Sequence, residues 1–181
     1  MKPAARSSSG FTLIELLIVV AMVAVLAMLA APSLRSIFAN QALSSATSDL
    51  MSAALQARGA SLRYNKRVVV QPLTTDDWTS GWRIYVDNDQ DAAFDSAADT
   101  LLATQEPLSP TVVGEVFSGS ISNLTQFAFE GTGFLYKGTG FNDGTVVLKS
   151  NVTTRKKYLV ISNSGRARIC DPSLMPGCAP T

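Results

Sequence analysis

The stretch FTLIELLIVVAMVAVLAMLAAP, residues 11–32, decides how this chain is organised. It contains a single charged residue, Glu15, and the ten residues before it carry Lys2 and Arg6 but no acid. At a rise of about 1.5 Å per residue, a helix of this length crosses a hydrocarbon core of about 30 Å. We therefore predict that a helix near the N-terminus anchors the chain in a membrane.

An ordinary secretory signal is the alternative interpretation of this segment. Such a signal has a shorter apolar region, of about 7 to 15 residues, and a small-residue cleavage site after it. Here the apolar run is longer, and Ala31-Pro32 is a poor cleavage sequence. The glycine that invites cleavage, Gly10, lies before the apolar run. The sequence therefore favours an anchor that is retained.

The sequence GFTLIE, residues 10–15, resembles the processing site of type IV prepilins and type II secretion pseudopilins. The resemblance implies that residues 1–10 are a leader and that prepilin peptidase cuts between Gly10 and Phe11 and methylates the new amino terminus. It also implies residence in the inner membrane as a single-pass protein with a periplasmic C-terminal domain. Other pilins or pseudopilins are the implied partners, in a pilus or pseudopilus. Pro32 matches a helix-loosening proline common in these proteins.

Glu15 requires an explanation because a carboxylate in an apolar segment costs roughly 2.5 to 3.5 kcal/mol on insertion scales. After cleavage Phe11 carries an α-amine with an ordinary pKa of about 7.7 to 8.0, and methylation leaves it charged. We expect the amine of a neighbouring subunit to pair with Glu15 and to set the axial register during assembly. The alternative is a glutamate near the helix end that reaches the lipid headgroups.

The composition limits what the rest of the chain does. With 181 residues, it has room for the anchor and one domain of about 120 residues. The net charge is only +1, so contact with nucleic acid requires a local patch. Histidine is absent, which excludes His-based triads and His-ligated zinc. No nucleophile stands beside a recognisable base, so we expect no enzyme, no cofactor and no metal.

The helical pattern continues beyond Pro32 to Arg63, with small and apolar residues at three- and four-residue spacing. After Tyr64 the pattern changes to short β-like runs, at 68–71, 82–86, 126–129, 145–149, 158–162 and 167–170. Turn signals separate them, including Asn142-Asp143-Gly144.

We predict an α+β, type IV pilin-like fold, in which a long N-terminal helix (11–63), membrane-spanning in its first half, is capped by an antiparallel two-sheet β domain (64–181). Within that domain, Gly81-Trp82 and the block YVDND at 85–89 resemble the GspH and FimT subfamily of minor pilins and pseudopilins.

A basic cluster without an intervening acid stands at the predicted helix end: Arg58, Arg63, Lys66 and Arg67. Cations here interact favourably with the helix dipole, so the cluster indicates a solvated helix end.

An acidic loop follows at residues 87–95. Asp87, Asp89, Asp91 and Asp95 stand at positions one, three, five and nine of an EF-hand-like pattern. However, Ala92 replaces the turn glycine, and Ala98 stands where the bidentate glutamate is needed. We therefore favour a solvated, aspartate-rich hairpin over a weak calcium site.

The chain contains two cysteines, Cys170 and Cys178, which enclose the short segment DPSLMPG. In an exported domain such a pair favours a disulfide over two free thiols. Closing so short a loop contributes roughly 2 to 3 kcal/mol in the chain-entropy model.

The last predicted hairpin, KYLVISNSGRARIC at 157–170, consists of two strands around an Asn163-Ser164-Gly165 turn. Because side chains alternate along a strand, Arg166 and Arg168 project from one face and Ala167 and Ile169 from the other. Charged residues on such a strand often serve only to discourage edge-to-edge aggregation.

The sequence G-R-x-R in this hairpin resembles the motif by which FimT-type minor pilins contact DNA during natural transformation. The resemblance implies that Gly165, Arg166 and Arg168 contact double-stranded DNA, with Arg155, Lys156 and Lys157 extending the patch. We therefore predict a type IV minor pilin that assembles through its N-terminal helix and binds DNA non-specifically for uptake. The alternative is a GspH-type pseudopilin of a type II secretion system, with a structural and protein-interaction role.

Overall fold

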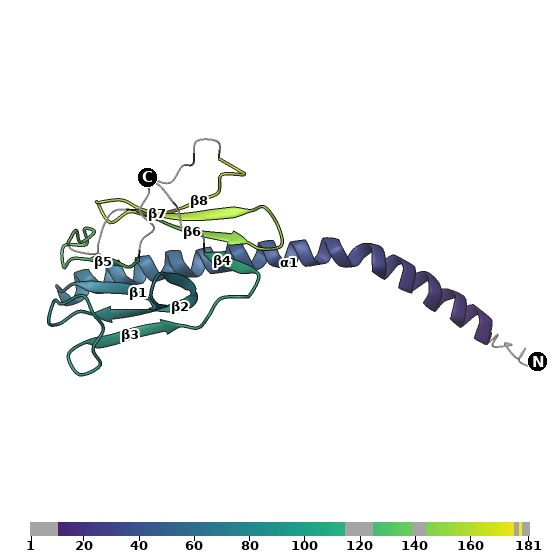
Figure 1. Cartoon of the computed structure of the whole chain (residues 1–181), viewed down its shortest axis with the longest axis horizontal. Coiled ribbons are helices and arrows are strands. Elements are labelled where there is room, and N and C mark those ends of the chain that lie inside the picture. Colours follow the sequence, from purple (N-terminus) through teal and green to yellow (C-terminus); the bar gives the residue numbers. More distant parts are fainter. Residues whose placement is uncertain (1–10, 115–124, 139–143, 176–177, 179–181) are drawn as a thin grey trace, which may run out of the picture. The chain divides into compact units, whose positions relative to one another are not determined.

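The computed structural model describes residues 11–114, 125–138, 144–175 and 178 (Figure 1). One long helix, α1 (Leu13–Tyr64), precedes all the strands in the chain. Two compact units are present: the first ends at Ile37 and the second begins at Phe38. The second unit therefore contains the later part of α1 together with the β-strands.

The strands form two four-stranded sheets in which all pairings are antiparallel. The first sheet has the order β3-β2-β1-β5, with β1 (Val68–Thr74), β2 (Asp77–Val86), β3 (Thr100–Gln105) and β5 (Phe127–Phe129). The second has the order β4-β6-β7-β8, with β4 (Val112–Gly114), β6 (Gly144–Ser150), β7 (Lys156–Ile161) and β8 (Ala167–Cys170). This arrangement confirms the predicted α+β fold with an antiparallel two-sheet domain.

The later part of α1 and both sheets share one core. The helix contributes residues at three- and four-residue spacing, all fully or almost fully buried: Leu43, Ala46, Leu50, Ala53 and Ala57. Each sheet contributes the side chains on one of its two faces, among them Val70, Phe127, Leu148 and Leu159. The alanines matter because a small side chain lets the strands approach the helix backbone closely. Figure 1 draws β1–β3 and β6–β8 on opposite sides of this part of α1.

The first unit has a different character. Every residue from Phe11 to Met28 is exposed. A helix that is apolar all round requires lipid or other helices to cover it. No single helix among the described residues is long and apolar enough to cross a membrane by itself. Leu13–Met28 and Pro32–Tyr64 meet that requirement only when they are taken together as a bent pair.

All six predicted strand segments are strands; the bounds of the last, 167–170, are as predicted, and those of the other five differ. β2 begins at Asp77, five residues before the predicted run at 82. β3 and β4 were not predicted, because β3 is a largely exposed edge strand without hydrophobic alternation and β4 has only three residues. The turn predicted at Asn142-Asp143 lies outside the described residues.

A buried ion pair overturns two predictions about charged clusters. Arg67 Nε donates to Asp87 Oδ2 over 2.6 Å, and the two side chains are 8% and 0% exposed. Asp87 also accepts hydrogen bonds from the backbone N–H groups of Gln90 and Ala92. The Arg67 guanidinium lies over the Tyr136 ring, 4.5 Å from its centre. The prediction of a solvated helix end is therefore wrong for Arg67, and the prediction of a solvated hairpin is wrong for Asp87.

We predict that Asp87→Asn lowers the free energy of unfolding by about 3 kcal/mol, because it leaves the buried Arg67 cation without a counter-charge. Urea denaturation followed by tryptophan fluorescence measures this loss. Asp91→Asn is the matched control: Asp91 is exposed in the same loop, and its replacement should change stability by less than about 0.5 kcal/mol. Equal losses of stability in the two variants would contradict a specific stabilising role for the Arg67–Asp87 ion pair.

Candidate functional site

The β7–β8 hairpin forms as predicted and presents the candidate DNA-binding residues. Tyr158 pairs with Cys170, Val160 with Arg168 and Ile161 with Ala167. The turn is closed by two backbone hydrogen bonds, from Gly165 N to Ser162 O (2.8 Å) and from Ser162 N to Arg166 O (3.0 Å).

The alternation predicted for this strand is confirmed. Ala167 packs against the shared core, whereas Arg166 and Arg168 are exposed. No ion pair to either arginine is present among the described residues. Both guanidiniums are therefore available to an external anion. Arg166 directly precedes β8 and Arg168 lies in it, and two residues of extended chain span about 6.6 Å.

Gly165 is required by the packing of its turn. Its φ is +74°, a value that disfavours other residues, and a Cβ here would overlap the carbonyl oxygen of Gly133. In the G-R-x-R sequence, the glycine thus shapes the hairpin that carries the arginines.

Arg58 joins this turn to α1. Its Nε donates to Gly133 O over 3.0 Å and its Nη2 to Ser164 O over 3.2 Å. Leu135 N also donates to Asn163 O over 3.1 Å, so the segment 133–135 and the turn are bonded to each other. The prediction of a solvated helix end is wrong for Arg58 as well. Sequence reasoning missed this role because the two acceptors lie 75 and 106 residues away along the chain.

The other predicted cations divide between two faces of the second sheet. Arg155 is exposed and stands just before β7. Lys156 is half-buried on the outer face, next to Lys149, which pairs with it across β6 and β7. Lys157 lies on the inner face: its Nζ donates to Ser44 Oγ over 3.0 Å and lies 3.9 Å from Asp171 Oδ2. Its assignment to the exposed patch is therefore wrong, and Lys149 joins the patch because of the strand register.

The predicted Cys170–Cys178 disulfide is present. Cys170 belongs to a small outer-face cluster with Val147, Tyr158 and Val160, and Cys178 packs against it. The disulfide therefore holds the chain's last described residue on the face from which Arg168 projects.

Asp171, which directly follows Cys170, is the acidic residue closest in sequence to Arg166 and Arg168. Burial alone would raise the pKa of its carboxyl, but the hydrogen bonds from Ser173 and the charges of Lys157 and Arg155 outweigh it and lower the pKa. Asp171 is thus an internal counter-charge that leaves Arg166 and Arg168 free.

The processing and assembly residues have a local arrangement of their own. Gly10 lies outside the described residues, and Phe11 is exposed. Thr12 Oγ1 accepts a hydrogen bond from Glu15 N over 3.3 Å, and Glu15 Oε2 accepts one from Thr12 N over 3.2 Å. This is a reciprocal capping box, so Glu15 has a partner within its own chain. The T-x-x-E sequence carries that signal, which sequence reasoning missed.

The acidic loop does not form the EF-hand-like set. The carboxylates that come together are those of Asp87, Asp89 and Asp99, whereas Asp91 and Asp95 are exposed outside that group.

Comparison with known proteins places this geometry in a class. Solved structures of the type IV minor pilin FimU of Pseudomonas aeruginosa PAO1 share the fold, with TM-scores of 0.54 and 0.51 at 19% and 20% identity. These matches cover 72% and 70% of this chain and 89% and 91% of the FimU chains. The fold is therefore that of type IV pilin-like proteins.

Family profiles refine this assignment. The profile described as type II transport protein GspH matches residues 46–165, and the prokaryotic N-terminal methylation motif matches residues 5–31. The chain belongs to the GspH family, and it has the role of a minor pilin or pseudopilin. A search of curated protein sequences returned no match.

We predict that Gly165→Ala lowers the free energy of unfolding by about 1 to 3 kcal/mol, because alanine is strained at this φ and overlaps the Gly133 carbonyl. Gly59→Ala is the control, since a Cβ at Gly59 meets nothing within 4 Å and alanine favours helix, so stability should rise by up to about 1 kcal/mol. Thermal unfolding of both variants measures the difference. A Gly165→Ala variant as stable as the parent would contradict the proposed packing.

Proposed function

We propose that this protein is a minor pilin of a type IV pilus that binds double-stranded DNA without sequence preference during natural transformation. The observation that supports DNA binding is the pair of exposed arginines, Arg166 and Arg168, on a hairpin held to α1 by Arg58. We propose a binding and assembly role in place of a catalytic one.

The chemistry of the patch suits phosphate and little else. A guanidinium presents paired N–H donors that match phosphate oxygens, and two on one strand face contact neighbouring phosphates of a backbone. Lys156 lies on the outer face of the same sheet and extends the positive surface, and the exposed Arg155 stands next to it in the chain. Tyr158, the aromatic residue opposite Cys170, is only 8% exposed, so it offers no platform for unstacked bases. Such a site favours sequence-independent contact with the duplex backbone.

Assembly follows from the first unit. Cleavage between Gly10 and Phe11 by prepilin peptidase leaves a charged amine at the start of an apolar helix whose side chains lie exposed from Phe11 to Met28. In the inner membrane, lipid covers these side chains and the β domain lies in the periplasm. In the filament, helices of other pilins replace the lipid. Glu15 then exchanges its capping contact with Thr12 for the amine of a neighbouring subunit.

We predict that the mature protein begins with N-methylated Phe11. Intact-mass and N-terminal peptide analysis of protein purified from membranes checks this. A Gly10→Val variant should keep residues 1–10, because it replaces the glycine after which the cut is expected. Mature protein that keeps the leader, or that begins after Ala31, would contradict the pilin assembly route.

We predict that the full chain in detergent binds duplex DNA weakly, with log K falling against log salt at a slope of roughly −3 to −4 if three or four cations displace counterions. Arg166→Gln combined with Arg168→Gln should weaken binding to all duplex sequences alike and reduce the slope by about 2. Fluorescence anisotropy at several salt concentrations measures both quantities.

Arg63→Gln is the control, because it removes an exposed guanidinium at the end of α1, away from β8 in sequence. Binding should change little in this variant. Unchanged binding in the double variant would remove the assigned site.

A secretion-system pseudopilin is the second candidate, and the match to the type II transport protein GspH profile favours it. Both candidates share the anchor and the fold, but they differ in the use of the β7–β8 hairpin. Absence of DNA binding by the parent protein would favour the secretion role, in which the domain contacts other pseudopilins or cargo.

A further inference from the structure

The outer side of β3 is an open sheet edge. β3 is the last strand of the first sheet in the order β3-β2-β1-β5, and Figure 1 draws it at the margin of that sheet. Its sequence, TLLATQ, contains no charged residue and no proline, and Leu101 is 50% exposed. No backbone hydrogen bond to its outer side is present among the residues that the structure describes. Proteins commonly protect such an edge with charges, proline or a covering segment, so an unprotected edge favours addition of another strand.

The other sheet edges differ from β3. β4 and β5 have only three residues each, and the outer side of β5 is partly covered: Phe129 forms a bridge with Leu135, and Tyr136 N donates to Ala128 O over 2.8 Å. β8 is the edge of the second sheet and carries the exposed Arg168. Within the described ranges, β3 and β8 are therefore the two sheet edges that are open and longer than three residues.

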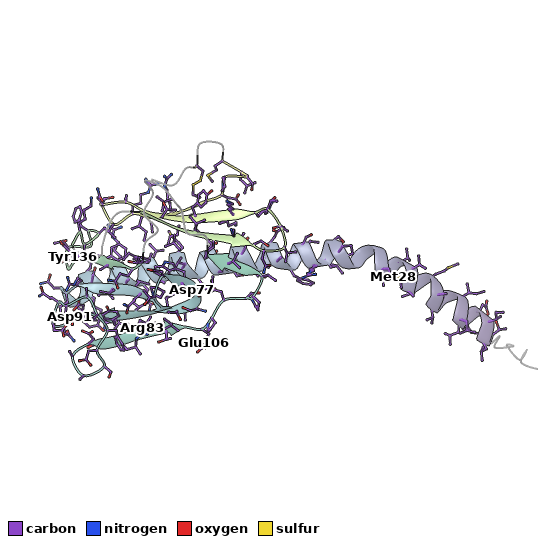
Figure 2. All side chains as sticks on the ribbon, in the orientation of Figure 1. Met28, Asp77, Arg83, Asp91, Glu106 and Tyr136 are labelled. Atoms are coloured by element: carbon purple, nitrogen blue, oxygen red, sulfur yellow. A yellow bond between two sulfur atoms is a disulfide. The ribbon has the colours of Figure 1, made fainter. Side chains whose placement is uncertain are left out.

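A groove beside β3 indicates which side chains a partner strand needs. The groove has a volume of about 150 Å³, and its lining includes Asp49 of α1, Trp82 of β2 and Thr104 of β3. Asp49 is exposed and has no ion pair or side-chain hydrogen bond in the described part of the chain. Glu106, which is labelled at the end of β3 in Figure 2, is exposed as well. A long basic side chain suits this place, because its aliphatic stem packs on apolar surface while its charge reaches a carboxylate.

Charge decides which edge of a second copy fits β3. Antiparallel pairing of β3 with another β3 would place Asp99 of each copy opposite Glu106 of the other, and like charges across a strand pair repel. Pairing of two β8 strands would bring arginines together for the same reason. Residues 87–106 contain six acids and no lysine or arginine, whereas residues 149–168 contain six lysines and arginines and no acid. Pairing of β3 with β8 is therefore the combination in which opposite charges meet.

We propose that β3 of one copy of this chain binds β8 of a second copy as an added strand, with Arg166 and Arg168 of the second copy directed to Asp49 and Glu106 of the first. The two copies use different edges, so the contact is heterologous and repeats from subunit to subunit. A contact of this size is weak in solution, but anchoring of both copies through α1 raises their effective concentration.

This contact goes beyond DNA binding, because it joins the β domains of two copies. It also limits where DNA binds. A copy whose β8 is paired uses Arg166 and Arg168 in the contact, so DNA reaches these arginines only on copies whose β8 is free.

The test is photo-crosslinking of the full chain in detergent, with p-benzoylphenylalanine in place of Thr104 and an isotope-labelled second copy in the mixture. Mass spectrometry of the crosslinked peptides identifies the partner segment, and the label shows that the crosslink joins two copies. We expect crosslinks from position 104 to β8 of the labelled copy, with a yield that falls as salt is raised. The same substitution at Thr75 is the matched control, because Thr75 is an exposed threonine between β1 and β2, and it should give no such crosslink.

Charge variants test the choice of partner edge. Asp49→Asn combined with Glu106→Gln should lower the yield of the β3–β8 crosslink about fivefold, because it removes both acids that the arginines reach. Asp76→Asn combined with Glu130→Gln is the control, with the same two chemical changes at exposed positions that follow β1 and β5, and its yield should stay within about twofold of the parent. All four positions are exposed, so thermal unfolding of both variants should match the parent closely.

Three outcomes would overturn the proposal. The first is the absence of a crosslink between copies from position 104, or a crosslink to a segment other than β8. The second is an equal yield from position 75. The third is an equal loss in the two double variants, which would indicate attraction by net charge alone. The crosslinking is measured without DNA, so its outcome does not depend on whether Arg166 and Arg168 bind DNA.

Discussion

The second unit depends on the burial of one face of α1 against both sheets. Leu43 and Leu50 are fully buried in the core that α1 shares with both sheets, and the small alanine side chains on the same face let strands approach the helix backbone. The buried hydroxyl groups of α1 form hydrogen bonds within the helix. Thr47 Oγ1 donates to Leu43 O over 2.7 Å, and Ser61 Oγ donates to Arg58 O over 2.8 Å. Among the described residues no strand pairing joins the two sheets, and the helix packs against both of them in the shared core.

This shared core explains why the candidate interface is well positioned. Inward residues of β7 and β8 pack on the core, so Arg166 and Arg168 must face outward. Arg58 reaches from α1 to Gly133 and Ser164, and it fixes the turn that precedes them. Arg58 thereby helps to position Arg166 and Arg168, although it is not itself part of the candidate DNA-binding patch.

Local pattern was sufficient for much of this architecture. The three- and four-residue spacing of α1, the turn at Gly165 and the outward arginines were predicted because each depends on residues close in sequence. Edge strand β3 escaped prediction because its pairing with β2, and not its own hydrophobic pattern, makes it a strand. Lys149 was missed and Lys157 was assigned to the wrong face for a related reason: strand register and the position of Ser44 decide which cation faces outward.

The sequence by itself determined the apolar segment of residues 11–32, the methylation motif, the fold class and the disulfide pair, because these depend on composition, short motifs and having only two cysteines. Only the tertiary structure decided which charged residues are buried and which of them lie together. Arg67 and Asp87 are twenty residues apart and become a buried pair, and Asp99 joins Asp87 and Asp89 in place of Asp91. Burial and proximity of charges arise from the packing of distant segments, which local periodicity does not encode.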